Sequence, residues 1–252
     1  MFEISAKTDI GPAAAQNDDR ILVEDRIYSD ASFYSKVNSS FINFAICDGV
    51  GGLSFGNVAA ETALNTITEL GACDVDEGSI IDKIFKANDE VNKQRVRLHK
   101  DGGLRTTLVG VISDGEKTLA YHVGDSRAYL FNRPYLIQVT EDHSLVNELV
   151  KRGELTEDAA FHDARKNIIT RSLGVEKLMR PSIDDISDDF MDGSIIMLCS
   201  DGISDVMEKQ ELKEIFNDDR LSLEEMKNKI YDSAVNKGSD DNISLILVRK
   251  VH

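Results

Sequence analysis

Apolar and polar positions along the chain follow two periods, and each period predicts one type of secondary structure. Two-residue alternation and short apolar runs are typical of strands. They predict strands at residues 1–9, 20–25, 41–47, 106–113, 118–124, 126–132, 135–140, 193–200 and 243–250. The polar stretch 26–40 is interpreted as a loop or an edge hairpin.

Apolar residues at helical spacing, together with capping residues, predict the helices. They are expected at 57–70, 79–100, 144–153, 156–161, 208–217 and 222–238. Ser144 and Thr156 occupy the positions expected of N-caps. The second helix is predicted to bury a face made of Ile80, Ile81, Ile84, Phe85, Ala87 and Val91.

The order of these elements predicts the fold class. Strands follow one another in meanders, with one run over 106–140, and helices come in pairs, without strict strand–helix alternation. This order favours antiparallel sheets covered by helix pairs, an α+β layered sandwich, over a doubly wound parallel sheet. Three prolines and no linker-like tract lead us to expect one domain over residues 1–252.

Composition narrows the choice of partners and compartment. The formal net charge of −16 argues against nonspecific binding to nucleic acid or to an anionic membrane. No window approaches the length of an apolar membrane span, and the first residues lack the features of a signal peptide. The three cysteines match neither a zinc pattern nor a disulfide framework, so a reducing, cytoplasmic location is expected.

Acidic residues recur where predicted strands end. Asp48, Asp125 and Asp201 each follow an apolar run, and Asp18–Asp19 and Asp240–Asp241 flank two others. Carboxylates gathered at strand ends repel one another unless cations neutralise them, and all-oxygen ligation favours Mg²⁺ or Mn²⁺ over zinc. The glycines of "DGVGG" (48–52) and "SDG" (200–202) allow sharp turns beside the carboxylates. The alternative interpretation is that each Asp–Gly pair is an ordinary turn.

A set of motifs spanning most of the chain resembles a known family. The motifs are "NDD", "DGVGG", "TT", "HVGDSRAYL", "TEDHSLVNELVKRGELT", "NIITRSLG", "LCSDGISD" and "GSDDNISLILV". In this order they resemble bacterial metal-dependent Ser/Thr protein phosphatases of the type 2C class. The resemblance implies a four-layer α-β-β-α sandwich, with two antiparallel sheets flanked by helix pairs. It also implies a single phosphatase catalytic domain with a mobile flap at about 145–170.

The same resemblance implies a metal centre of two or three Mn²⁺ or Mg²⁺ ions. By motif position, Asp48 and the Gly49 carbonyl would bind metal, Asp201 and Asp241 would hold the second ion, and Asp125 a third. Asp19 would orient metal-bound waters, which makes Asp19 and Asp48 the expected catalytic residues. The implied reaction is hydrolysis of phosphoserine and phosphothreonine by a metal-activated water.

The sequence departs from the family pattern at the phosphate-binding position. Ala14 stands where the family usually has an arginine, and Asp18 stands where it usually has a glutamate. An arginine fork is the natural ligand of a phosphate group. We hypothesise that Arg105 supplies the missing contact, with Arg20 and Lys7 as rivals; the alternative is that Arg105 is a surface residue at a strand end.

Three functional interpretations remain open at this point. The first is a cytoplasmic signalling hydrolase, a monomer that opposes a cognate Ser/Thr kinase by dephosphorylating its protein substrates. The second, motivated by Ala14, is a pseudophosphatase that binds phosphoproteins with weak or no turnover. The third is a purely structural metal-binding domain. Because every expected metal aspartate is present, the sequence favours the enzyme.

Overall fold

Two antiparallel sheets form the centre of the molecule. The computed structural model describes residues 1–50, 55–99, 103–178 and 180–251. In spatial order, the first sheet contains β4 (Ala31–Val37), β1 (Phe2–Asp9), β12 (Ile243–Lys250), β11 (Ile195–Cys199), β8 (Arg127–Asn132) and β9 (Tyr135–Gln138). The second sheet contains β10 (Ser182–Asp185), β7 (Thr118–Val123), β6 (Leu108–Ser113), β5 (Ile42–Cys47), β2 (Arg20–Val23) and β3 (Arg26–Tyr28).

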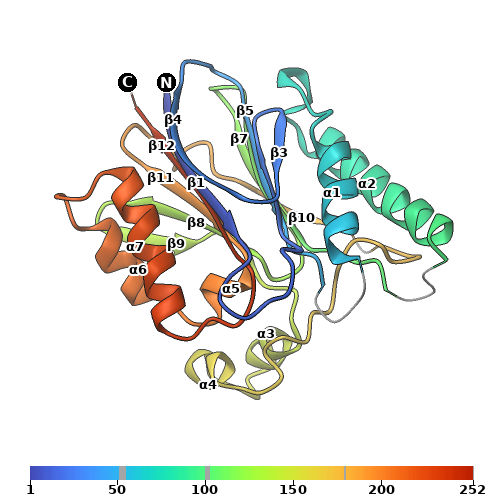
Figure 1. The fold of residues 1–252 in the computed structure, drawn as a ribbon. Helices are drawn as coiled ribbons and strands as arrows, with labels where there is room; N and C mark the ends of the chain where they lie inside the picture. Colours follow the sequence, from blue (N-terminus) through green and yellow to red (C-terminus); the bar gives the residue numbers. More distant parts are fainter. Residues whose placement is uncertain (51–54, 100–102, 179, 252) are drawn as a thin grey trace.

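Helices cover the outer face of each sheet (Figure 1). The second sheet is covered by α1 (Gly56–Ile67) and α2 (Glu77–Arg97), joined by the short 3₁₀ helix η1 (Ala72–Asp74). The first sheet is covered by α5 (Asp201–Ser204), α6 (Lys209–Phe216) and α7 (Leu223–Asn236). Two further helices, α3 (Leu145–Lys151) and α4 (Glu157–Phe161), lie at one end of the sandwich. The predicted α+β sandwich with four layers is confirmed.

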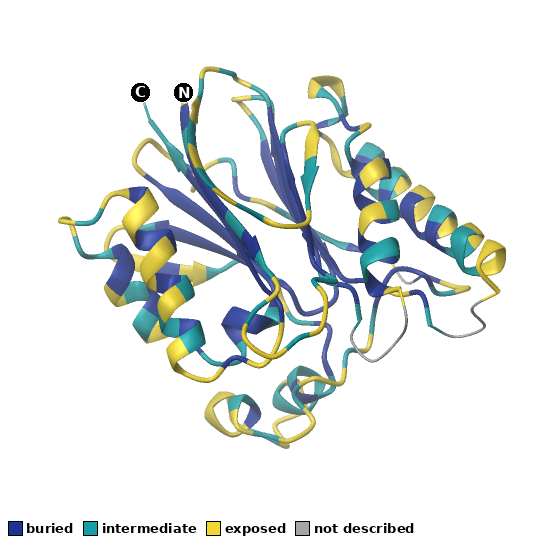
Figure 2. Ribbon diagram, viewed as in Figure 1, coloured by how far each residue is buried: buried dark blue, intermediate teal, exposed yellow. Residues whose placement is uncertain are grey.

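Three apolar layers hold these elements together. One lies between α1–α2 and the second sheet, one between the two sheets, and one between the first sheet and α5–α7. The inner strands of both sheets are almost continuously buried, whereas the edge strands β3, β4, β9 and β10 are partly exposed and the helices expose their outer faces (Figure 2). A strand that is buried on both faces loses its polar alternation, as in β5, where all six residues are buried.

Most predicted elements are confirmed within one to three residues, and the expected caps are present. The Ser144 hydroxyl accepts a hydrogen bond from the Asn147 amide at 3.4 Å, and Thr156 accepts one from Ala159 at 3.2 Å. The predicted apolar face of α2 is correct except for Ile81 and Phe85, of which Phe85 is 37% exposed. The end of the predicted helix at Lys100 lies outside the described residues.

The structure corrects three predictions of topology. Residues 26–40 form neither a loop nor a hairpin, because β3 pairs with β2 in one sheet and β4 pairs with β1 in the other. The expected single meander over 106–140 is divided, since β6 and β7 belong to the second sheet and β8 and β9 to the first. The edge strand β10 was not predicted, because two of its four residues are aspartates. Strand pairing depends on distant partners, which local patterns do not contain.

Candidate active site

Three strand ends deliver carboxylates to the same end of the sandwich. Asp48 directly follows β5, Asp125 comes two residues after β7, and Asp201 comes two residues after β11. Strands β5 and β7 both pair antiparallel with β6, so they point in the same direction and end at the same edge. Asp201 opens the short helix α5, rather than the sharp turn that its Asp–Gly pair predicted.

The carboxylates at this end interact electrostatically, and we call Asp19, Asp48, Asp125, Asp201 and Asp241 the acidic centre. Desolvation, followed by repulsion from Asp201 and Asp19, raises the pKa of Asp48 well above its usual range. Desolvation and then the charges of Asp125 and Asp241 do the same to the pKa of Asp201. The structure therefore brings together five acids that are far apart in sequence.

Asp19 is the most deeply buried member of the acidic centre. Only 1% of its surface is exposed, and its Oδ2 accepts a hydrogen bond from the Ser200 hydroxyl at 2.8 Å. Burial raises the pKa of Asp19 to about 7, partly offset by its serine partners. Burial likewise raises the pKa of Asp125 to about 7. A carboxyl with this pKa is only partly ionised at neutral pH unless a cation stabilises its charge.

The backbone of Asp48 is held by a neighbouring pair of threonines. The Asp48 carbonyl accepts hydrogen bonds from the Thr107 amide and the Thr106 hydroxyl, both at 2.8 Å. A Cβ at Gly49 would lie 2.4 Å from the Gly56 backbone, so only glycine fits there. The predicted role of the "DGVGG" glycines can be assessed at Gly49 alone, because Gly51 and Gly52 lie outside the described residues.

Asn242, which the sequence interpretation did not single out, fixes the segment that carries Asp18 and Asp19. Its Oδ1 accepts a hydrogen bond from the Asp18 amide at 2.7 Å. Its Nδ2 donates to the carbonyls of Ile10 and Gln16 at 2.8 and 3.0 Å. The signal was present in the "SDDN" motif, but a single sequence does not reveal that an asparagine next to two aspartates serves the backbone of another loop.

Asp18 plays a structural part beside the acidic centre. Its carboxylate accepts a hydrogen bond at 2.9 Å from the Asn57 amide, in the first turn of α1. The side chain of Phe55, the N-cap residue of α1, provides no such capping bond. Asp18 therefore stabilises the start of α1, where a negative charge also favours the helix dipole.

The donor chemistry of the acidic centre fits a hard divalent cation, although its side chains are not gathered around a ready-made ion position. Within the described residues, no group of three His, Cys, Asp or Glu side chains could hold an ion as placed. Among the described atoms of the acidic centre, one buried atom lacks a hydrogen-bond partner: Oδ1 of Asp201. An orphaned carboxylate oxygen among other carboxylates suits Mg²⁺ or Mn²⁺.

The three candidate phosphate-binding cations lie in different surroundings. Arg20 is 7% exposed and donates to the backbone carbonyls of Asn17 and Asp19 at 2.9 and 2.7 Å, so its contacts favour a structural role. Lys7 lies over the Tyr231 ring, 3.4 Å from its centroid. Arg105 is exposed, and its carbonyl accepts a hydrogen bond from the Val50 amide at 3.1 Å. Arg105 thus contacts the backbone after Asp48, whereas Arg20 pairs with Cys47, directly before Asp48.

Comparisons with known proteins agree with this geometry. The sequence model of the family described as Protein phosphatase 2C matches residues 13–243. The chain is 33% identical over 225 residues to "Serine/threonine phosphatase stp" of Listeria monocytogenes, covering 86% of this chain and 87% of that protein.

Solved structures share the fold over the whole chain. Serine/threonine phosphatase Stp1 of Staphylococcus aureus superposes with a TM-score of 0.85 at 26% identity, covering 100% of this chain and 96% of that one. The catalytic domain of the phosphatase PstP, described in complex with two manganese ions, gives a TM-score of 0.80 at 22% identity, with both chains fully covered. At that identity the second match concerns the fold alone.

Proposed function

The chain belongs to the protein phosphatase 2C family and is a phosphoprotein phosphatase, and we propose that it acts on phosphoserine and phosphothreonine. The observation that carries the proposal is the acidic centre, where Asp201 interacts with Asp125, Asp241 and Asp19 and itself raises the pKa of Asp48. The 33% identity to a serine/threonine phosphatase supports the choice of substrate residues. We also propose that residues 1–252 act as one catalytic domain and as a cytoplasmic monomer opposing a cognate kinase.

Two or three Mn²⁺ or Mg²⁺ ions are the proposed cofactors. Asp48, the Gly49 carbonyl, Asp201, Asp241 and Asp125 would hold them, and Asp19 would orient the waters. When bound, such ions would lower the pKa of water, so that it can lose a proton near neutral pH and act as the nucleophile, and they would neutralise phosphate charge. Asp19 suits its role because the Ser200 hydroxyl fixes one carboxylate oxygen, Oδ2.

Arg105 is the proposed phosphate ligand from the protein. Its side chain is exposed and makes no ion pair within the described residues, so its guanidinium can reach a substrate without breaking an existing contact. Its backbone pairing with Val50 places its Cα next to the Asp48 loop. A planar guanidinium forms two parallel hydrogen bonds with a phosphate group. This contact would replace the one that the family's usual arginine makes from the position occupied here by Ala14.

Metal-dependent turnover is the direct test. We expect the protein to hydrolyse p-nitrophenyl phosphate and phosphothreonine peptides with Mn²⁺ and to lose this activity in EDTA. Asp48→Asn and Asp201→Asn should each reduce kcat by at least about a hundredfold, because each removes charge from the proposed metal site. Asp82→Asn, at an exposed position of α2, is the matched control. Binding of phosphopeptides without turnover by the wild type would instead support the pseudophosphatase.

A further inference from the structure

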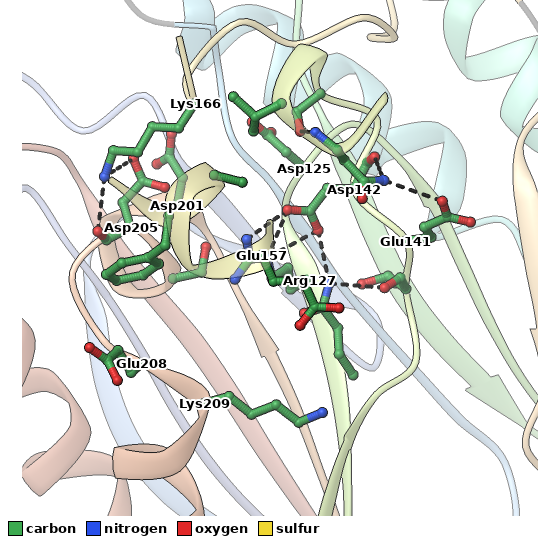
Figure 3. A pocket seen from close by; sticks show the side chains of 18 of the residues that line it. Asp125, Arg127, Glu141, Asp142, Glu157, Lys166, Asp201, Asp205, Glu208 and Lys209 are labelled. Atoms are coloured by element: carbon green, nitrogen blue, oxygen red, sulfur yellow. Dashed lines mark hydrogen bonds and ion pairs between the residues drawn. The ribbon is translucent and has the colours of Figure 1, made fainter. Parts of the chain in front are cut away.

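A groove leads away from the acidic centre beneath α3 and α4. It has a volume of about 610 Å³, and Asp125 and Asp201 line its inner end. Its walls come mainly from three places: the segment with α3 and α4, residues 138–142 at the end of β9 and just after it, and residues 204–210 from α5 into α6. Figure 3 shows carboxylates from all three walls facing the same space. A phosphorylated side chain at the acidic centre would therefore have neighbouring residues in this groove.

The groove has a surplus of negative charge. Eight acidic side chains line it, against three basic ones. Two of the basic groups are already neutralised: Arg127 pairs with Asp142 at 2.7 Å, and Lys166 pairs with Asp205 at 3.1 Å. A separate set, which we call the outer acids, forms no ion pair within the described residues; it consists of Glu157, Asp158 and Glu208.

The chain's own Lys166 shows how this groove binds an ammonium group. Its Nζ lies 3.1 Å from the Asp205 carboxylate and 2.9 Å from the Asp205 carbonyl, which it reaches as a donor. The same Nζ lies 5.7 Å from the centroid of the Phe161 ring. The partly exposed apolar lining residues Val150 and Phe161 offer a surface for the methylene stem of a long basic side chain. The groove thus offers an ammonium group a carboxylate, a carbonyl and an aromatic ring. Lys166 already uses all three.

We propose that this groove binds lysine or arginine residues that neighbour the phosphorylated residue, so that the enzyme selects basic phosphoprotein segments. The inference rests on the proposed function, because it takes the acidic centre to hold the phosphate. The phosphate would lie near Asp125 and Asp201, where the proposed divalent ions would balance its charge. The basic neighbours lie toward the outer acids, where no cation of the described residues offsets Glu157 or Asp158.

The test compares two phosphothreonine peptides that differ only in the flanking residues, lysine in one and glutamate in the other. We expect the wild type to have a kcat/KM roughly tenfold higher for the lysine peptide, since each exposed charge pair contributes modestly. In the double variant Glu157→Gln, Asp158→Asn this ratio should fall to about two. Each variant's activity toward p-nitrophenyl phosphate serves as the internal reference for its catalytic centre.

The matched control is Glu154→Gln, which removes a charge from the same segment but does not line the groove. It should keep the full preference for the lysine peptide. Calorimetric titration of each variant with the phosphonate analogue of the lysine peptide measures the same selectivity without turnover. Weaker binding by the double variant alone supports the proposal.

The outcomes separate this inference from the proposed function. If p-nitrophenyl phosphate is hydrolysed but both peptides react equally well, or if the double variant retains the preference, the groove assignment is overturned. If nothing is hydrolysed, the proposed function fails, and the titration still decides: equal binding of the lysine and glutamate phosphonates overturns the groove assignment as well.

Discussion

The two sides of the acidic centre differ in how firmly they are held. On one side, Asp48 follows a strand whose six residues are all buried, and two threonines hold its carbonyl. On the other side, α3 buries only Val146, and α4 buries only Ala160. Figure 2 shows the contrast between the buried inner strands, the half-buried helix α3 and the largely exposed helix α4. The reactive Asp48 therefore lies at the end of a rigid strand. The groove that we assign to selectivity lies beside the lightly packed helices α3 and α4.

One segment, residues 168–175, connects the two sides. At its start, the Ile168 carbonyl accepts a hydrogen bond from the Leu145 amide at 2.8 Å, at the first residue of α3. Further along, Leu173 and Thr106 exchange two backbone hydrogen bonds. At its end, the Gly174 amide donates to Oδ1 of Asn88 in α2 at 2.9 Å. Residues 168–175 thus join the first residue of α3 to Thr106 and to α2.

The largest effect on stability is expected from the ionisation of the buried Asp19, on the rigid side. Burial raises the pKa of Asp19 from 3.8 to about 7, and this corresponds to a cost on the order of 4 kcal/mol once it ionises. Below about pH 4 the group is protonated in both states and costs nothing. Without metal, the free energy of unfolding should therefore fall as the pH rises from about 4 through about 7.

Thermal unfolding in EDTA across this pH range measures the decline, and Mn²⁺ should reduce it. Asp19→Asn should show a shallower decline than the wild type, because the substituted residue does not ionise. A melting temperature in EDTA that stays level or increases over this interval would contradict the electrostatic account of the acidic centre.

The next largest effect is expected at Asn88, the anchor of the connecting segment. Its Oδ1 accepts from the amides of Gly174 and Val175, and its Nδ2 donates to the Val175 carbonyl at 3.0 Å. Asn88→Ala leaves the amides of Gly174 and Val175 without their acceptor, whereas the Val175 carbonyl keeps its hydrogen bond from Asn92, and the change should cost about 2 to 3 kcal/mol of stability. Urea unfolding measures this. Asn65→Ala, whose side chain is exposed on α1, is the control and should change little; equal losses in both variants would refute the anchoring role.

A smaller effect is expected at Arg105, on the substrate side of the Asp48 loop. Arg105→Ala should raise KM for p-nitrophenyl phosphate about tenfold with little change in kcat, because one charged contact to phosphate is lost. Arg97→Ala, at another exposed position, is the control. Conversely, Ala14→Arg should lower KM about threefold. An unchanged KM in Arg105→Ala would show that this arginine does not bind phosphate.

The smallest effect should come from the lightly packed side. Lys166→Met removes a partly exposed ion pair with Asp205, and such pairs contribute about 0.5 kcal/mol. Global stability should hardly change, but amide hydrogen exchange in α4 should accelerate. The control Lys229→Met, at an exposed position of α7, should leave amide hydrogen exchange in α4 unchanged. Slower exchange in the Lys166 variant would show that the ion pair does not hold this segment.

Local patterns were sufficient for elements whose stability is local. Ser144 and Thr156 were recognisable as caps because the side chain and the amide that it caps lie only three residues apart. The acids Asp48, Asp125 and Asp201 were recognisable because each comes within two residues of the end of an apolar strand. Phe85 was wrongly assigned to the buried face because helical spacing places it at the border of that face.

Contacts between distant residues were not predictable in this way. The hydrogen bond from the Asp18 amide to Asn242 spans 224 positions, and no local pattern encodes it. The ion pair between Lys166 and Asp205, which joins two walls of the groove, was not predicted either. The same holds for the division of the expected meander between two sheets. The apolar runs of β7 and β8 are compatible with a place in either sheet.

The sequence by itself determined the periodicity of the strands and helices, the caps, and the presence of carboxylates at strand ends, because each depends on neighbours a few residues away. Its motifs also indicated the family. Only the tertiary structure decided which sheet each strand joins, that five acids share one electrostatic centre, and that an acidic groove runs from it. Those features depend on which distant surfaces exclude water together, and the free energy of that burial belongs to the whole fold.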